Sequence, residues 1–346
     1  MKHLLKRTIY SLLVLLGVVV LVFTMFQGLG DPARLMVGQT GDKKTMDNIR
    51  SELYLDQPKW KQFALYLDDV SPICIHTKED IDHKQLKGLF IGGDTKIGIK
   101  FPYLRKSYQT KKNVSTVLLD ALPGTILLAV AAMLFAIVVG ILLGVLAAVK
   151  KGTWWDTSAV LVSIAGISAP SFFIALVIAY LFGIVLHPFT GLNLTGSWFD
   201  IDEVTGERYL TLKNLILPAF TLGIRPLAII VQLTRSSMLD VLNQDYIRTA
   251  YAKGLNKSTI IFKHALRNAL NPVITAITGW FAELLAGAFF VEYIFGWNGI
   301  GKLTVDALEK LDYPVVMGSV LLSACLFILI NMFSDVMYKI IDPRVR

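Results

Sequence analysis

The residues most suggestive of chemistry form a glycine-rich run from Gly296 to Lys302. This run fits the first seven positions of the phosphate-binding pattern G-x-x-x-x-G-K-[ST], in which backbone N–H groups and the lysine hold nucleotide phosphates. The eighth position should be Ser or Thr to hold magnesium, and it is Leu303 here. The run also follows an apolar stretch, without the strand-to-helix context of the motif. We therefore reject nucleotide binding by this chain.

The other reactive side chains form no recognisable catalytic set. The sequence contains neither H-E-x-x-H nor G-x-S-x-G, and its five histidines are scattered at positions 3, 76, 83, 187 and 264. Cys74 and Cys325 lie far apart and predict no disulfide framework. His76 and His83 lie near Cys74, but their spacing fits no standard metal site, and a solvated loop is the favoured interpretation. We predict no catalytic residue and no metal site.

Two ionisable residues, Arg225 and Glu283, interrupt long apolar stretches. A charge at that depth in a membrane costs about 2.5–3.5 kcal/mol on insertion scales, so each residue needs a partner or a function. Both lie about ten residues from the outer ends of their stretches, and this matching depth predicts a salt bridge between them. The alternative is that Arg225 lines a path through the membrane and meets carboxylates there.

Long apolar stretches dominate the chain. Hydrophobic residues make up 54% of its 346 residues, and a soluble domain cannot keep that much apolar surface from water. Gly140 and Gly144 predict close helix packing, while Pro170 and Pro226 predict kinks or hinges. The sequence predicts an all-α membrane protein with about six transmembrane helices. The stretches long enough to cross about 30 Å of hydrocarbon are 8–26, 122–149, 159–186, 215–233, 273–293 and 315–341.

Basic residues set the predicted orientation. A net charge of +8 in a soluble protein would suggest nucleic acid, but here the basic residues flank the apolar stretches. Short segments on one side carry most of them, including Lys2, Lys6, Lys150 and Lys151, and the positive-inside rule places that side in the cytoplasm. We expect a multi-pass protein of the cell inner membrane with both termini cytoplasmic.

The domain organisation follows from these stretches. Residues 1–27 form an N-terminal transmembrane helix, which we expect to be retained because no A-x-A cleavage site follows it. Residues 28–115 form a long extracytoplasmic segment, and 116–341 form a core with five transmembrane helices. The core includes a polar cytoplasmic loop over 235–271, and residues 342–346 form a cytoplasmic tail.

The cytoplasmic loop has the pattern of two helices joined by a turn. Residues up to Lys253 are good helix formers, and Gly254 stands where a helix end favours a left-handed residue. Ser258 is the expected N-cap of a second helix, which Pro272 should limit. Because this pair is tethered between two membrane spans, it would read DNA poorly, and we do not predict nucleic-acid binding.

The same loop carries a family resemblance. Its run Thr249–Leu255, followed by His264–Ala269 and Pro272, resembles the EAA loop of ABC importer permeases, in the version of the dipeptide/oligopeptide branch. The resemblance covers nearly the whole chain and is closest to the first of the two dissimilar permeases of such importers. Further landmarks agree in order, namely Gly30–Ala33, Leu55–Pro58, Leu122–Thr125, Leu217–Ala219, Leu233–Met238, Phe295–Gly301 and Asp312–Pro314.

The resemblance implies a type I importer permease fold in which this loop forms a coupling helix that docks on a cytoplasmic ATPase. The general Glu-Ala-Ala motif matches Arg248, Thr249 and Ala250, so its Glu is absent and the contact chemistry is less defined. Ala250 would permit close approach of the ATPase, and Gly254 a sharp exit from the helix. Arg267 stands where many importers have proline. The coupling positions are Arg248, Thr249, Ala250, Tyr251, Ala252, Lys253, Gly254, His264 and Arg267.

The resemblance also implies partners. A homologous second permease, two ATPases that bind ATP and magnesium, and an extracytoplasmic substrate-binding protein would complete a peptide importer in the lipid bilayer. This chain would hold no cofactor and would not be an enzyme. Its long outside segment would cap the outer mouth and contact the binding protein.

Three other functions are weighed from the residues alone. A proton-coupled secondary transporter would use Arg225 and Glu283 as a charge relay. The second is a membrane-embedded hydrolase, against which the absence of active-site motifs counts. The third is an assembly scaffold, which identification of the proteins bound to this chain would test. Within the family, the solute is open among dipeptides, oligopeptides, glutathione, nickel chelates and peptide antibiotics.

Overall fold

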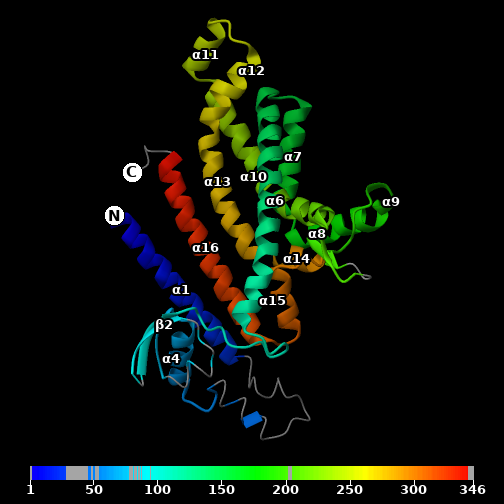
Figure 1. Cartoon of the computed structure of the whole chain (residues 1–346). Coiled ribbons are helices and arrows are strands. Elements are labelled where there is room, and N and C mark those ends of the chain that lie inside the picture. Colours follow the sequence, from blue (N-terminus) through cyan, green and yellow to red (C-terminus); the bar gives the residue numbers. More distant parts are fainter. Residues whose placement is uncertain are drawn as a thin grey trace. The chain divides into compact units, whose positions relative to one another are not determined.

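The chain forms two compact units (Figure 1). Unit 1 combines Met1–Leu122 with Leu303–Cys325, and unit 2 combines Pro123–Lys302 with Leu326–Arg346. The landmark Gly30–Ala33, His83 and the tail 342–346 lie outside the described residues. The structure, a computed structural model, describes residues 2–28, 46–47, 50, 54–77, 81, 84, 86, 88–93, 95–201 and 205–341.

Long apolar helices build unit 2. Its core is formed by buried small and β-branched side chains, such as Ala132, Ile230 and Val273, where the helices meet. Gly140 lies against Ile230, and Gly144 against Thr234, which confirms the predicted close helix packing. The main helices are α6 (Val114–Val149, which begins in unit 1), α7 (Trp154–Ser168), α8 (Ser171–Tyr180), α10 (Ile216–Leu242) and α13 (Leu266–Gly287).

Shorter elements connect these helices. Between α8 and α10 lie η1 (Leu181–Val185), α9 (His187–Thr190) and η2 (Leu212–Leu215), with a two-stranded antiparallel sheet of β4 (Phe199–Ile201) and β5 (Arg208–Leu210). After α13 the chain continues through α14 (Phe289–Ile294), α15 (Ile300–Glu309) and α16 (Tyr313–Ile341). Helices α15 and α16 each contribute residues to both units.

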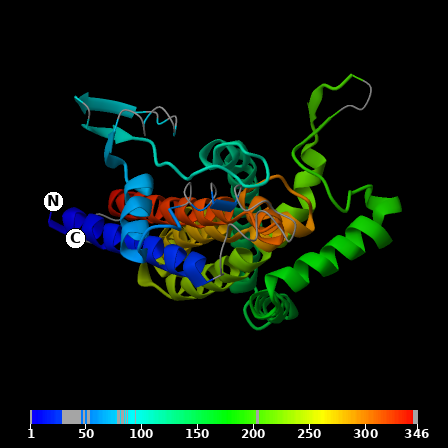
Figure 2. The ribbon, with the colours of Figure 1, turned by 90° about the horizontal axis from the view of Figure 1, so that it is seen from below.

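The prediction of about six spans is confirmed, and several of the predicted bounds change. Among the described residues, five helices are long and apolar enough to cross a membrane, and there are six spans if α7 and the segment 171–185, which bend by 109°, count as one (Figure 2). Pro170 lies at this bend, as expected from its missing N–H group, whereas Pro226 lies inside the unbroken α10. The second span begins earlier than predicted, at Val114, and the fifth helix ends at Gly287 and not at Tyr293.

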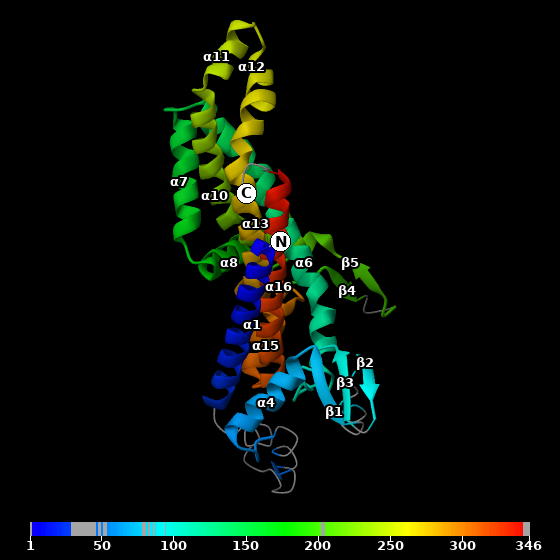
Figure 3. The same ribbon diagram turned by 90° about the vertical axis from the view of Figure 1, so that its left-hand side faces the viewer.

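Unit 1 holds α1 (Lys2–Gly28) and a small domain in the segment between α1 and α6 (Figure 3). This domain consists of α4 (Lys59–Val70) and three strands, β1 (Ile73–Thr77), β2 (Gly88–Gly92) and β3 (Thr95–Lys100). The strands form an antiparallel sheet in the order β1-β3-β2. The sequence did not predict either sheet, so the all-α class describes the membrane-spanning part of the chain.

Candidate functional site: a docking segment between α10 and α13

The predicted coupling segment begins with α11 (Asp245–Ala252). Gly254 has a φ of +74°, which confirms that a left-handed residue ends this helix. The next helix, α12 (Lys257–Thr259), is capped by Asn256, whose Oδ1 accepts a hydrogen bond from the Thr259 N–H at 2.8 Å. The predicted Ser258 cap is therefore wrong, because the helix begins earlier and Asn256, two residues before Ser258, caps it.

The second half of the segment runs directly into a membrane span. After α12 the chain forms the π-helical turn η3 (Ile260–Ala265) and then α13, without a break at Pro272. The prediction that Pro272 limits this helix is wrong. Pro272 lies six residues after the start of α13, and the helix continues through it.

One face of α11 is anchored in unit 2. Ile247 is fully buried and Ala250 is 6% exposed, in a cluster with Met238 of α10 and Val145 of α6. A hydrogen bond also joins α11 to α13, because Asn268 Nδ2 donates to the Tyr246 hydroxyl at 2.8 Å. Ala250 thus lies against the chain's own core, and the expectation that it leaves room for a partner does not match this structure.

The opposite face of α11 is open. Arg248 forms only an exposed ion pair with Asp245, at 3.3 Å, and the turn around Gly254 has no neighbour within 4 Å of where a Cβ would stand. Figure 1 shows this helical pair as a projection at the end of the long helices. His264 is half-buried. The predicted positions that are exposed are Arg248, Thr249, Tyr251, Ala252, Lys253, Gly254 and Arg267.

A buried ion pair links α10 to α7 near this segment. The Arg235 guanidinium binds the Asp156 carboxylate with both Nε and Nη2, the second contact at 2.9 Å. The Gly152 N–H also donates to Asp156, at 3.0 Å. Sequence reasoning found Arg235 only as part of a landmark and missed Asp156, which lies two residues into α7 and carries no motif of its own.

Arg225 and Glu283 do not form the predicted salt bridge in this structure. Both side chains are exposed in the single chain. The Arg225 guanidinium lies over the Trp280 ring, 5.9 Å from its centroid, so a cation–π contact joins α10 and α13 where the ion pair was expected. A secondary transporter that passes charge between Arg225 and Glu283 has no support from this geometry.

The glycine-rich run binds a carboxylate of its own chain. The buried Glu292 side chain accepts hydrogen bonds from the Gly301 N–H at 2.7 Å, the Lys302 N–H at 3.1 Å and the Thr125 hydroxyl at 2.8 Å. A Cβ on Gly299 would lie 2.3 Å from this carboxylate. The backbone donors that resemble a phosphate cradle are thus already occupied, which supports the rejection of nucleotide binding.

A second buried carboxylate, Asp69, lies in unit 1 among cations. Lys84 Nζ is 2.7 Å from its Oδ1, Arg105 Nε is 3.7 Å from its Oδ2, and Lys100 Nζ donates to its backbone carbonyl at 2.9 Å. Burial lowers the pKa of Lys84, but the Asp69 carboxylate opposes this more strongly, and the pKa is raised. The cluster holds the end of α4 against the sheet.

His76 lies beside this cluster, with its Nδ1 3.2 Å from Asp68. Burial of the ring lowers the pKa of His76, and the Asp68 carboxylate only partly opposes that shift. Among the described residues, no three His, Cys, Asp or Glu side chains are grouped so that they could hold a metal ion. His83, the other histidine considered above as a metal ligand, lies outside the described residues.

Apolar spans joined by an exposed helical segment between α10 and α13 fit a membrane transport component. The comparisons with known proteins agree. The chain belongs to the family of binding-protein-dependent transport system inner membrane components, whose model matches residues 140–346, and the N-terminal model of the same system matches residues 1–84. The predicted resemblance to ABC importer permeases is confirmed, and the chain is a multi-pass inner-membrane protein.

Relatives extend over nearly the whole chain. The dipeptide transport system permease protein DppB of Escherichia coli (strain K12) is 37% identical over 96% of this chain and 94% of its own. DppB of Alkalihalophilus pseudofirmus is 33% identical over 99% of this chain and 98% of its own. The glutathione transport system permease protein GsiC of Escherichia coli O6:H1 is 33% identical over 100% of this chain and 99% of its own.

A solved structure shows the same fold. The inward-facing MetNI methionine ABC transporter matches with a TM-score of 0.52 at 18% identity, over 66% of this chain and 97% of the matched chain. This likeness supports the type I permease fold.

Proposed function

We propose that this chain is the membrane-spanning permease of an ATP-driven importer for peptides. The observation that carries the proposal is the full-length similarity to permeases named for dipeptide and glutathione transport. Glutathione is itself a small peptide, so these relatives share a substrate class. The chain supplies the path and changes its opening, while ATP and magnesium bind to separate ATPase subunits.

The docking segment is the proposed ATPase contact. Its exposed face offers Arg248, Tyr251 and the Gly254 turn to a partner, while Ile247 and Ala250 are fixed in the core. A displacement of the exposed face would therefore be passed to α6 and α10, on which the buried face packs. This anchoring suits a helix that must transmit force to the membrane spans.

The remaining parts of the proposal concern assembly and orientation. The docking segment and both termini would lie in the cytoplasm, because the basic residues cluster on that side. A homologous second permease would complete the path, and two ATPases would bind the docking segments of the pair. A substrate-binding protein would deliver peptide on the extracytoplasmic side.

Purification of the tagged protein from its native membrane in mild detergent tests this proposal. We expect a second permease and one or two kinds of ATPase polypeptide to co-purify. Reconstituted with its binding protein, the complex should import a labelled dipeptide or glutathione only with ATP. If the protein purifies alone, or if an ionophore and not ATP depletion stops uptake, the proposal is wrong.

A matched pair of variants tests the docking segment. Arg248→Ala combined with Tyr251→Ala removes two exposed side chains and should release the ATPases while the second permease stays bound. Lys112→Ala, an exposed change outside the segment, should release neither. Retention of the ATPases by the double variant, with normal ATP-driven uptake, would place the contact elsewhere.

A further inference from the structure

One face of the unit 1 sheet is aliphatic and uncovered. Residues of adjacent strands pair so that six side chains form two rows across the sheet. Each of the six is between 59% and 82% exposed. Contiguous apolar patches of this kind mark a contact surface, whereas single exposed apolar residues do not. The rows are Ile73, Ile99 and Leu89, followed by Ile75, Ile97 and Ile91.

The domain folds without using this face. The other face of the sheet carries Cys74, His76 and Lys100, all buried, and Lys100 donates to the end of α4. The alternation of β1 between exposed and buried residues is complete. Because the core of the domain lies wholly on one side, the aliphatic rows are available for a contact outside the chain.

The packing of α4 on α1 fixes how deep this domain lies. The Phe63 ring lies 5.2 Å from that of Phe23, and Tyr66 is buried with Val19 and Leu321. Gln62 pairs with Gln27 at the end of the α1 span. Two successive turns of α4 thus contact the Phe23 ring, near the Gln27 end of α1.

The position of this contact along α1, counted from Gln27, can be compared with the thickness of one membrane leaflet. Phe23, on whose ring Tyr66 stacks at 5.8 Å, is four residues from Gln27, or about 6 Å along the helix, and each leaflet contains about 15 Å of hydrocarbon. The candidate span from Thr8 to Gln27 has only 20 residues, all of which are needed to cross. Tyr66 therefore lies beside α1 at the depth of that leaflet.

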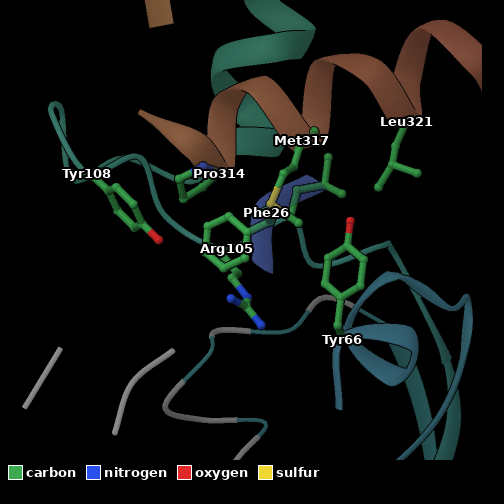
Figure 4. A pocket seen from close by; sticks show the side chains of 9 residues that line it. Phe26, Tyr66, Arg105, Tyr108, Pro314, Met317 and Leu321 are labelled. Atoms are coloured by element: carbon green, nitrogen blue, oxygen red, sulfur yellow. The ribbon is translucent and has the colours of Figure 1, made fainter. Parts of the chain in front are cut away.

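A small cavity shows the same contact from the side of α16. Phe26, Tyr66, Met317 and Leu321 line it together, and the Tyr66 hydroxyl points toward α16 (Figure 4). Met317, which lines the cavity with Tyr66, is likewise four residues from the start of its helix at Tyr313. Two spans thus agree on the depth of Tyr66, and β1 begins only seven residues later, at Ile73.

We propose that the aliphatic face of β1, β3 and β2 lies against lipid, in the leaflet at the Gln27 end of α1. Helix α1 of the same unit also exposes apolar side chains, including Leu21 and Met25. The rows contain no Tyr, Trp or Arg, the residues that dominate protein interfaces, which favours lipid over a partner protein. Because both edge strands leave backbone groups that need water, the face lies at the boundary between acyl chains and headgroups.

Fluorescence quenching in lipid nanodiscs tests this proposal on the full chain. Ile91→Cys carries an environment-sensitive fluorophore in a Cys325→Ser background, while Cys74 is kept because it is buried. Lys61→Cys, exposed on the first turn of α4, is the matched control. Leu89→Cys is a second reporter if the first variant does not fold. Doxyl-labelled lipid and aqueous iodide are compared as quenchers.

We expect doxyl lipid to quench the label at position 91 several-fold more than at position 61, and iodide to show the reverse order. Strong iodide quenching at position 91 that falls when the substrate-binding protein is added would overturn the proposal and assign the face to that protein. Protection from both quenchers in the assembled transporter would also overturn it, because another subunit would then cover the face.

Discussion

Asp69 and Glu292 are both buried acids, yet the chain stabilises them by opposite means. Asp69 is 1% exposed and has two cationic side chains, Lys84 and Arg105, directed at its carboxylate. Glu292 is fully buried and is held by two backbone N–H groups and the Thr125 hydroxyl. The first arrangement depends on whole charges and the second on dipoles.

The difference follows from what surrounds each acid. Asp69 stands where a strand, a helix end and a loop meet, and long side chains can reach it from all three. Glu292 lies where glycines bring the backbone within hydrogen-bonding distance, and Gly299 and Gly301 have no room for a side chain. A missing partner would therefore leave a buried charge in the first case and unpaired N–H groups in the second.

The largest expected effect is that of Asp69→Asn. This change leaves Lys84 and Arg105 buried without their counter-charge, which costs about 3–5 kcal/mol for buried pairs. Hydrogen exchange of β1 and β3 should rise sharply, as measured by mass spectrometry. Asp68→Asn, on a more exposed neighbour, serves as the control and should have a much smaller effect. Equal exchange in both variants would show that Asp69 is not the centre of the cluster.

Glu292→Ala should have the next largest effect. It leaves the Gly301 and Lys302 N–H groups and the Thr125 hydroxyl without an acceptor, at a cost of about 3 kcal/mol. Glu292→Gln keeps a carbonyl for the N–H pair and should cost about 1 kcal/mol. Thermal unfolding in detergent measures both variants. If Gln were as harmful as Ala, the negative charge itself would be required, and the contrast with Asp69 would fail.

The pH dependence near Asp69 should be smaller. Burial holds the pKa of His76 below its usual 6.5, so the folded domain disfavours the charged ring. Stability is then fully present above about pH 6.5 and is lost as pH falls from there toward the lower folded pKa. Exchange of β1 measured at about pH 7.5 and pH 5.5 should show this loss, and His76→Gln should remove it. A pH-independent wild type would contradict the prediction.

The smallest effect on stability is expected for Arg225→Gln, because neither kind of stabilisation surrounds this exposed residue. The change should shift stability by about 0.5 kcal/mol or less. ATP-driven uptake should fall if Arg225 faces the transport path. Reversing both charges, Arg225→Glu with Glu283→Arg, should not restore uptake, because the two residues do not pair. Full rescue by the double reversal would show that they pair in another state of the transporter.

Sequence reasoning succeeded where the signal is local or repeated. The apolar stretches predicted the spans, and Gly254 predicted the left-handed end of α11, because a single residue type carries that conformation. It failed at Ser258, because Asn256 caps the helix instead, and at Pro272, because the helix continues through that proline. The sheet was missed because β1, β2 and β3 are short and separated by polar residues that read as loop.

The segment between α10 and α13 was predicted as a functional site from the family resemblance more than from the physical properties of its residues. No pattern in the sequence shows that Ala250 faces inward while Tyr251 faces outward, because both are compatible with an amphipathic helix of eight residues. Glu292 and the glycine-rich run can each be recognised in the sequence. Their hydrogen bonds cannot be predicted, because they depend on a fold that also brings Thr125 to the Glu292 carboxylate. The Arg225 and Glu283 pairing failed because matching depth along two helices does not fix which way each helix is rotated.

The open surroundings of Gly254 have a consequence for how that position can vary. A glycine is indispensable for one of two reasons, the backbone angle it adopts or the closeness of a neighbour. Within this chain only the angle applies, because an added methyl group would meet nothing. Asparagine tolerates the same angle, so a protomer with Gly254→Asn should fold normally. Any loss of function in that variant would then measure the shape of a surface belonging to another subunit.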